Sequence, residues 1–266
     1  MADAAPILEL TGVTKSFGGV HAVRDCSFTV REGSLTGLIG PNGAGKSTTV
    51  DLISGFKGVD SGRIVFGGRE IQNRPPHVVS RLGLVRSFQT PREWARLTTL
   101  ENLLVAPVDD ARESLRTALT RRAWMNDSER ASRSVARELL EEFGLSRVKN
   151  ELAGNLSGGQ KRLLEFARIL MVRPRLVLLD EPQSGVNPVL GERMGDAIRR
   201  MVDSGITVVM VEHNLGFVER LCDVVIVMAL GTPIATGTMA ELRRNPDVLE
   251  AYLGQATLPT GGTAGV

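Results

Sequence analysis

The sequence predicts an α/β fold built on a parallel sheet, and three apolar runs carry that prediction. Each run leads directly into glycine-rich or polar residues: 35–39 before 40–48, 176–179 before 180–181, and 207–211 before 212–214. Fully apolar runs are typical of strands buried on both faces of a parallel sheet, and such sheets bind ligands at the carboxyl ends of their strands. We therefore expect the polar residues after these runs to form one functional edge.

The first of these segments has the spacing of a P-loop between a strand and a helix. It reads Gly40, Pro41, Asn42, Gly43, Ala44, Gly45, Lys46, Ser47 and Thr48. The glycines allow backbone N–H groups to converge on phosphate, and the following helix adds its positive dipole. Lys46 is placed to reach the β- and γ-phosphates, and the Ser47 hydroxyl to ligate Mg²⁺. The sequence predicts nucleotide binding, against the alternative of a glycine-rich turn with an incidental lysine.

Composition excludes several other classes of protein. The 266 residues contain 32 Lys and Arg against 30 Asp and Glu, so the net charge of +2 demands no polyanionic partner. Cys26 and Cys222 are isolated, which argues against a disulfide scaffold or zinc site and suits two small buried side chains. No apolar run approaches the roughly 20 residues that span a bilayer, and residues 1–6 do not resemble a secretory signal.

The N-terminal part predicts short antiparallel strands. Residues 7–11 and 23–30 have strand patterns, residues 61–66 and 70–71 predict a hairpin, and residues 15–19 predict a turn that exposes Phe17. If that turn folds toward the nucleotide, Phe17 can stack on adenine through its π-face. The alternative is that Phe17 plugs the edge of the sheet.

The segment 98–155 changes character, because helix formers replace β-branched runs. Helices are predicted over 101–105, 111–122 and 128–143, with Gly144 as the stop of the last one. Trp94 and Trp124 either anchor a partner or pack within this helical lobe. Its arginines face either lipid headgroups or a membrane subunit, or else form a solvated surface. They are Arg112, Arg116, Arg121, Arg122, Arg130, Arg133 and Arg137.

A glutamine stands at the entrance to this lobe. The short β-run 84–88 ends at Gln89, and Pro91 rules out simple continuation of the strand. An amide in this position can reach a metal ion and the attacking water. A surface glutamine with no such role is the competing interpretation.

A second phosphate-binding pattern follows the lobe. Ser157, Gly158, Gly159 and Gln160 come directly before the predicted helix 161–171, and the pattern contains no lysine. Serine and glycine at a helix N-terminus are suited to binding an anion.

Two acidic residues follow the next apolar run. Successive strand residues point to opposite sides, so Asp180 and Glu181 can have different roles. We expect Asp180 to bind Mg²⁺ through its water shell and Glu181 to orient or deprotonate the attacking water. His213, after the run 207–211, is expected to contact the γ-phosphate rather than to be structural. Strands over 224–228 and 233–236, helices over 240–244 and 247–253, and a disordered tail over 257–266 complete the expectation.

In this order the motifs resemble the nucleotide-binding subunit of ATP-binding cassette (ABC) transporters, over roughly residues 7–255. The resemblance makes Phe17 the adenine-stacking aromatic, Gln89 the Q-loop residue, and residues 156–160 the family signature. It makes 184–187 the D-loop, where Asn187 replaces a common aspartate, and His213 the switch histidine. The implied fold is an ABC cassette with an antiparallel β subdomain and an inserted helical lobe. One domain would span residues 1–256, with its core at 1–90 and 156–256 and the lobe at 91–155.

The resemblance also implies a mechanism and partners. Two cassettes would bind two ATP molecules head to tail, with Ser157 and Gly159 of one protomer capping the γ-phosphate held by the P-loop of the other. The implied partners are a second ATPase subunit, identical or homologous, transmembrane permease subunits, and a periplasmic or extracellular solute-binding protein, with no nucleic acid. The implied location is the cytoplasmic face of the cell membrane.

Within that family, the stretch after 101–105 and the ending 245–254 look like the ATP-binding subunits of branched-chain amino-acid importers. Subunits for lipopolysaccharide export, or for urea or short amide uptake, are the nearest alternatives. A soluble cassette acting on ribosomes or DNA usually has two cassettes, a coiled coil or a zinc insertion, and this chain has one P-loop and no cysteine cluster. A small-molecule P-loop kinase leaves the signature unexplained.

Overall fold

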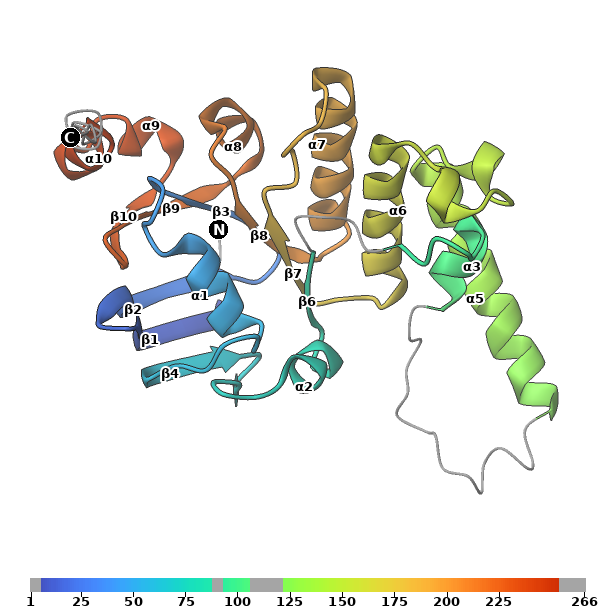
Figure 1. Ribbon diagram of the computed structural model, residues 1–266, viewed down its shortest axis with the longest axis horizontal. Helices are drawn as coiled ribbons and strands as arrows, with labels where there is room; N and C mark the ends of the chain where they lie inside the picture. Colours follow the sequence, from blue (N-terminus) through green and yellow to red (C-terminus); the bar gives the residue numbers. More distant parts are fainter. Residues whose placement is uncertain (1–5, 88–92, 106–121, 254–266) are drawn as a thin grey trace, which may run out of the picture. The chain divides into compact units, whose positions relative to one another are not determined.

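The computed structural model describes residues 6–87, 93–105 and 122–253, with the side chains of 122–129 excepted (Figure 1). The chain divides into two compact units. The first comprises Met1–Leu82 and Met201–Val266, and the second comprises Gly83–Arg200. The predicted lobe, 91–155, lies within the second unit, which also contains strands and helices outside those bounds.

An antiparallel sheet forms the N-terminal part of the first unit. Its strands lie in the order β2 (Val20–Arg31), β1 (Pro6–Phe17), β4 (Ser61–Phe66) and β5 (Arg69–Glu70). Leu8 pairs with Val30 on one side and with Phe66 on the other, and all three side chains are buried. The predicted hairpin is confirmed, since Gly67 and Gly68 both adopt positive φ at the turn between β4 and β5.

The prediction of a turn over residues 15–19 is wrong for its first three residues. Strand β1 continues to Phe17, which pairs with Val20, and only Gly18 and Gly19 form the turn. Both glycines have positive φ, 52° and 85°, so a two-residue connection closes the hairpin and the flanking residues stay in the ladder. Phe17 is therefore the last residue of a strand.

Four strands of the first unit carry its buried core. They lie side by side in the order β10 (Thr232–Gly237), β9 (Val224–Ala229), β3 (Leu35–Ile39) and β8 (Thr207–Val211). Strand β3 is parallel to β8 and β9, while β10 returns antiparallel to β9. Every residue of β3 and β8 is buried, as expected for strands covered on both faces.

Five helices accompany these strands in the described part of the first unit: α1 (Lys46–Ile53), α2 (Pro76–Arg81), α8 (Leu215–Leu221), α9 (Met239–Leu242) and α10 (Pro246–Leu253). The sequence did not predict α2 or α8. Both are short, at six and seven residues, and a window of that length contains too few turns for a helical period to be recognised.

The second unit combines two parallel strands with helices. Strands β6 (Leu84–Arg86) and β7 (Leu176–Asp180) pair in parallel, with Arg86 opposite Leu178. Helices α3 (Thr99–Leu104), α5 (Arg122–Glu142) and α6 (Gly158–Met171) pack against one another. The 3₁₀ turns η1 (Ser146–Val148) and η2 (Ala153–Asn155) connect them, and α7 (Pro188–Asp203) follows β7. The mixture of an antiparallel sheet, parallel strands and helices confirms the predicted α/β class.

Helix α7 was missed by the sequence analysis, although its pattern is clear. Met194, Ala197, Ile198 and Met201 are buried at helical spacing, and Pro188 occupies the first position, where its missing N–H is no cost. The stop predicted at Gly144 is confirmed, since this glycine follows α5 with φ 67°.

Several predictions fall outside the described residues. These are the tail 257–266, the predicted helix over 111–122 except its last residue, the residues Arg112, Arg116 and Arg121, and the side chains of Arg122 and Trp124. Trp94 is described, and the Arg168 guanidinium stacks 4.1 Å from the centre of its ring, which supports packing within the unit. Among the described residues, no helix is both long enough and apolar enough to cross a membrane.

Candidate functional site

The glycine loop of the first unit depends on backbone conformations that favour glycine. Gly40, Gly43 and Gly45 have φ of 148°, 79° and 98°. A Cβ atom on Gly40 would lie 2.1 Å from the carbonyl oxygen of Met228, and one on Gly45 would lie 2.5 Å from that of Ala22. Two of the three glycines are thus required by close backbone contacts as well as by φ.

Lys46 begins helix α1 and turns back over the loop. Its Nζ atom donates to the carbonyl oxygens of Gly40, at 2.7 Å, and Pro41, at 3.0 Å, and the side chain is buried. The next residue, Ser47, is exposed in the first turn of the helix. A cation and a hydroxyl in the first turn, with the helix dipole behind them, form an arrangement suited to phosphate.

Neighbouring elements of the same unit hold the loop. The Gly231 N–H donates to the Ala44 carbonyl at 3.1 Å, and the Arg24 N–H donates to Gly231 at 2.9 Å. Burial raises the pKa of the Tyr252 hydroxyl, and a hydrogen bond with the backbone of Gly40 opposes that rise. The C-terminal helix α10 therefore contacts the first residue of the glycine loop.

Phe17 is exposed at the end of β1, with 43% of its surface accessible. The ammonium groups of Lys57 and Lys15 lie 5.1 and 5.4 Å from the centre of its ring. Lys15 is in turn paired with Asp60 at 2.7 Å. An exposed ring flanked by two cations is suited to stacking with an aromatic group that carries negative charge nearby.

His213 follows β8 at the same edge as the glycine loop. Because Leu38 pairs with Val211 in parallel register, Gly40 and His213 both follow the carboxyl ends of adjacent strands. The His213 side chain is 66% exposed, whereas Glu212 beside it is 1% exposed and accepts the His213 N–H at 3.1 Å. The first unit therefore brings together the glycine loop and the predicted histidine.

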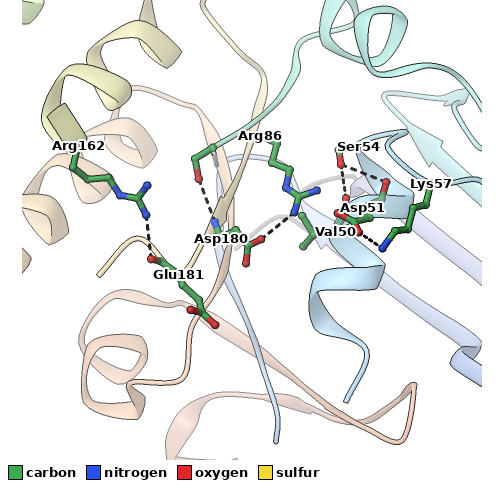
Figure 2. A network of polar contacts seen from close by, with 9 residues as sticks. Val50, Asp51, Ser54, Lys57, Arg86, Arg162, Asp180 and Glu181 are labelled. Carbon is green, nitrogen blue, oxygen red and sulfur yellow. Dashed lines mark hydrogen bonds and ion pairs between the residues drawn. The ribbon is translucent and has the colours of Figure 1, made fainter. Parts of the chain in front are cut away.

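In the second unit, Asp180 ends β7 and is almost fully buried. Its Oδ2 atom accepts from Arg86 Nη2 at 3.0 Å (Figure 2). Its backbone N–H donates to the Ser87 hydroxyl at 3.2 Å. The Oδ1 atom is buried with no hydrogen-bond partner among the described residues. An orphaned carboxylate oxygen of this kind fits a magnesium ion or its bound water.

Glu181 follows with a left-handed backbone, φ 47°, which is uncommon for a residue with a side chain. Arg162 Nη2 donates to its carbonyl oxygen at 3.1 Å (Figure 2). The Ser184 N–H donates to the same oxygen at 3.0 Å. Arg162 is 3% exposed and also pairs with Glu165 at 2.9 Å. The strained conformation is therefore held by a buried arginine from α6, the helix that precedes β7.

That arginine belongs to the helix that the second phosphate pattern begins. Ser157 is the N-cap of α6: its hydroxyl accepts from the Gln160 N–H at 3.3 Å, while the Gln160 side chain accepts the Ser157 N–H at 2.9 Å. Gly158 and Gly159 thus lie in the first turn. Since the cap uses the Ser157 oxygen as an acceptor, its O–H remains suited to donating to an anion.

Gln89 lies outside the described residues, so its predicted place beside the metal is not tested. Sequence reasoning also missed Arg86 and Arg162. Arg86 was detectable as a charge inside a β-run, and Arg162 as a charge three residues after the glycine pair on a helix with buried neighbours.

Comparison with known protein families agrees with this set of motifs. The protein-family model described as ABC transporter matches residues 23–184. A second model, described as branched-chain amino acid ATP-binding cassette transporter, matches residues 232–257. The chain therefore belongs to the ABC transporter family, whose nucleotide-binding cassettes couple ATP hydrolysis to transport.

The similar proteins indicate which branch of that family the chain resembles. The chain is 40% identical to the high-affinity branched-chain amino acid transport ATP-binding protein BraF of Pseudomonas aeruginosa, over 94% of this chain and 99% of the relative. It is 40% identical to the probable branched-chain amino acid transport ATP-binding protein LivG of Archaeoglobus fulgidus, over 93% and 95%. It is 34% identical to LivG of Escherichia coli, over 94% and 99%.

Solved structures agree with the fold. An ABC transporter cassette in its ADP conformation matches with a TM-score of 0.80 and 36% identity, over 94% of this chain and all of the other. A nucleotide-free cassette matches with a TM-score of 0.78 and 35% identity, over 93% and 99%. The predicted ABC cassette fold and nucleotide-binding class are thereby confirmed.

Proposed function

We propose that this chain binds and hydrolyses ATP to power the uptake of branched-chain amino acids through a membrane transporter. The observation that carries the proposal is similarity of 34–40% along nearly the whole chain to proteins named for branched-chain amino acid transport. The separate match of residues 232–257 favours this substrate class over lipid export or urea uptake.

Each site residue has a proposed role. Lys46 and the N–H groups of the glycine loop hold the phosphates, and Phe17 stacks on adenine. Ser47 and Asp180, with Gln89, hold Mg²⁺, which when bound neutralises charge on the phosphates. Glu181 activates the water and His213 contacts the γ-phosphate. The exposed Ser47, the orphaned Asp180 Oδ1 and the donors at the Glu181 carbonyl support these assignments.

The proposal includes a composite site and a set of partners. Ser157, the N-cap of α6, and Gly159 contact the ATP that is bound to a second ATPase subunit, so that ATP holds the two cassettes together. Permease subunits and a solute-binding protein complete the transporter, and the chain works at the cytoplasmic face of the membrane. Family membership supports these partners.

The test is Glu181→Gln, which keeps the size of the side chain and removes its basicity. We expect unchanged ATP affinity, steady-state hydrolysis reduced about a thousandfold or more, since general-base catalysis and water positioning are lost together, and a dimer that forms only with ATP. Hydrolysis is measured as phosphate release and dimerisation by light scattering. The matched control is Glu141→Gln, the same chemical change on an exposed helix position.

Undiminished hydrolysis in Glu181→Gln would remove this residue from the proposed mechanism. The substrate class is tested separately, by affinity purification of the chain from native membranes and mass spectrometry of what co-purifies. Recovery of permeases with a solute-binding protein that binds leucine, isoleucine or valine supports the proposal. A binding protein specific for urea, or an export complex without any binding protein, contradicts it.

A further inference from the structure

The ion pair between Arg86 and Asp180 joins two neighbouring strands inside the second unit. Arg86 Nη2 lies 3.0 Å from Asp180 Oδ2 (Figure 2). The two side chains are only 13% and 5% exposed. A carboxylate buried to this degree is costly unless it is paired, so the guanidinium compensates much of the desolvation of Asp180.

The backbone fixes the position of this arginine. Arg86 is opposite Leu178 in the parallel ladder of β6 and β7, and the Ser87 N–H donates to the Leu178 carbonyl at 2.9 Å. The Ser87 hydroxyl accepts the Asp180 N–H at 3.2 Å, so residues 86 and 87 hold Asp180 through both side chain and backbone. Arg86 is thus part of the site and not a mobile surface cation.

The two oxygens of Asp180 differ. Oδ2 is engaged by the guanidinium, while Oδ1 is buried with no hydrogen-bond partner among the described residues. A divalent cation that approaches Oδ1, directly or through its water, would therefore share one carboxylate with a fixed positive charge. Like charges repel strongly in a site of low dielectric, so the arginine offsets part of the attraction between the carboxylate and the metal.

We propose that Arg86 is a positioning residue that holds Asp180 in the absence of metal and sets the affinity of the nucleotide-loaded site for divalent cation by competing electrostatically with it. This inference rests on the proposed role of Asp180 at the Mg²⁺ site. It gives Arg86, on β6, a role beyond those proposed above. By weakening the attraction between Asp180 and the metal ion, Arg86 would allow the site to release the ion.

The experiment titrates Mn²⁺, as a paramagnetic probe, into the full chain saturated with β,γ-imido-ATP, and free Mn²⁺ is measured by electron paramagnetic resonance. Arg86→Met removes the charge and keeps much of the side-chain length. We expect it to tighten Mn²⁺ binding by on the order of tenfold, because one unit charge beside the carboxylate is gone. Arg86→Lys, which keeps the charge, should stay within about twofold of the parent chain.

Two controls separate a local effect from a general one. Arg200→Met removes the arginine of an exposed ion pair with Glu142 in the same unit, and it should leave Mn²⁺ affinity unchanged. Arg86→Gln, which is polar and uncharged, repeats the test if the methionine variant does not fold. Affinity for the nucleotide analogue in the presence of EDTA should match the parent chain for every variant that is compared.

Asp180→Asn separates the inference about Arg86 from the proposed metal role of Asp180. If Asp180→Asn weakens Mn²⁺ binding and Arg86→Met tightens it only when Asp180 is present, the inference holds. If Asp180→Asn weakens binding while Arg86→Met leaves it unchanged or weaker, the inference about Arg86 is overturned and the role of Asp180 survives. If Asp180→Asn has no effect, the proposed metal role of Asp180 itself fails, and the inference fails with it.

Discussion

At the scale of single residues, the site concentrates backbone conformations that most side chains avoid. Gly40 and Gly45 have positive φ together with backbone atoms where a Cβ would lie, and Glu181 has positive φ although it carries a side chain. For a residue with a side chain, such a conformation costs roughly 1–3 kcal/mol and persists where the surroundings hold it, whereas glycine adopts it without that cost. At Glu181 the guanidinium of Arg162 holds the backbone by donating to the carbonyl oxygen.

The glycine requirement gives the first prediction. Gly45→Ala should lower the free energy of unfolding by about 2–4 kcal/mol, because a strained φ adds to a contact 2.5 Å from the Ala22 carbonyl oxygen. The matched control is Gly68→Ala, where φ is also positive but nothing lies within 4 Å of the added Cβ. Its cost should be about 1 kcal/mol. Urea unfolding measures both variants, and equal costs would contradict the steric argument.

The thiol of Cys26 predicts a dependence of stability on pH. Burial, and then the negative charge of Asp25, raise the pKa of this thiol from 9.0 to about 12. Since the folded state favours the protonated thiol, its contribution is fully present below pH 9.0 and is lost as the pH rises from 9.0 toward 12.

Cys26→Ala should therefore lose less stability than the parent chain between pH 8 and pH 10.5, by about 1–2 kcal/mol. The comparison of two pH values cancels the constant cost of the smaller side chain. Urea unfolding at each pH checks this, and identical slopes for Cys26→Ala and the parent chain would show that Cys26 does not titrate differently on folding.

At the scale of elements, helix α6 links two motifs of the second unit. Its N-cap is Ser157, and on its buried face Arg162 donates to the carbonyl oxygens of Glu181 and Pro182. The Glu165 carboxylate, at 2.9 Å, balances the charge of Arg162 within the same helix. A displacement of α6 would thus move or break the hydrogen bonds that hold the backbone at Glu181.

Two helices of the second unit begin with the same type of N-cap, so the two caps can be compared by mutation. Thr98 of α3 and Ser157 of α6 both form capping boxes, with Glu101 and Gln160 as their partners. Thr98→Ala and Ser157→Ala should each lower the free energy of unfolding by about 1 kcal/mol, because each loses one N-cap hydrogen bond. Only Ser157→Ala should also weaken ATP-dependent dimerisation when introduced into the Glu181→Gln chain.

Light scattering across a range of ATP concentrations measures that dimerisation. A parallel loss in Thr98→Ala would mean that the effect of the Ser157 change is a general consequence of helix destabilisation. Full dimerisation in Ser157→Ala would mean that its hydroxyl contributes no contact to nucleotide beyond its role as a cap.

At the scale of the whole molecule, the motifs are divided between two compact units. The glycine loop, Phe17 and His213 belong to the first unit, whereas Asp180, Glu181 and Ser157 belong to the second.

The proposed composite site predicts complementation between two inactive chains. Lys46→Ala removes the phosphate contact and Ser157→Arg blocks the signature loop, so each variant alone should hydrolyse ATP at a few per cent of the parent rate or less. An equimolar mixture should recover about a quarter of the parent rate: half of the randomly formed dimers are mixed, and each of these has one intact site. The measurement is phosphate release against mixing ratio. No recovery at any ratio would contradict sharing between chains.

Much of the fold and the site could be predicted from the sequence, because the decisive signals are local. The apolar runs that became β3, β7 and β8 are buried at every position, as their composition indicates. The glycine loop precedes a helix as its spacing requires. The full extent of β1 was not predicted, because its last residues are held in the strand by pairing with β2. Helix α7 was not predicted either, although its buried residues recur at helical spacing.

By itself, the sequence determined the class of protein, since each motif is a short run of neighbouring residues. The glycines, the lysine and the serine specify contacts with phosphate, and the two carboxylates specify contacts with a metal ion and water. Only the tertiary structure decided which residues hold those groups. Arg86 reaches Asp180 across 94 positions of sequence, and Arg162 reaches the Glu181 carbonyl across 19. No periodicity or spacing encodes such pairs, because they depend on which strand and which helix pack together once the apolar core is buried.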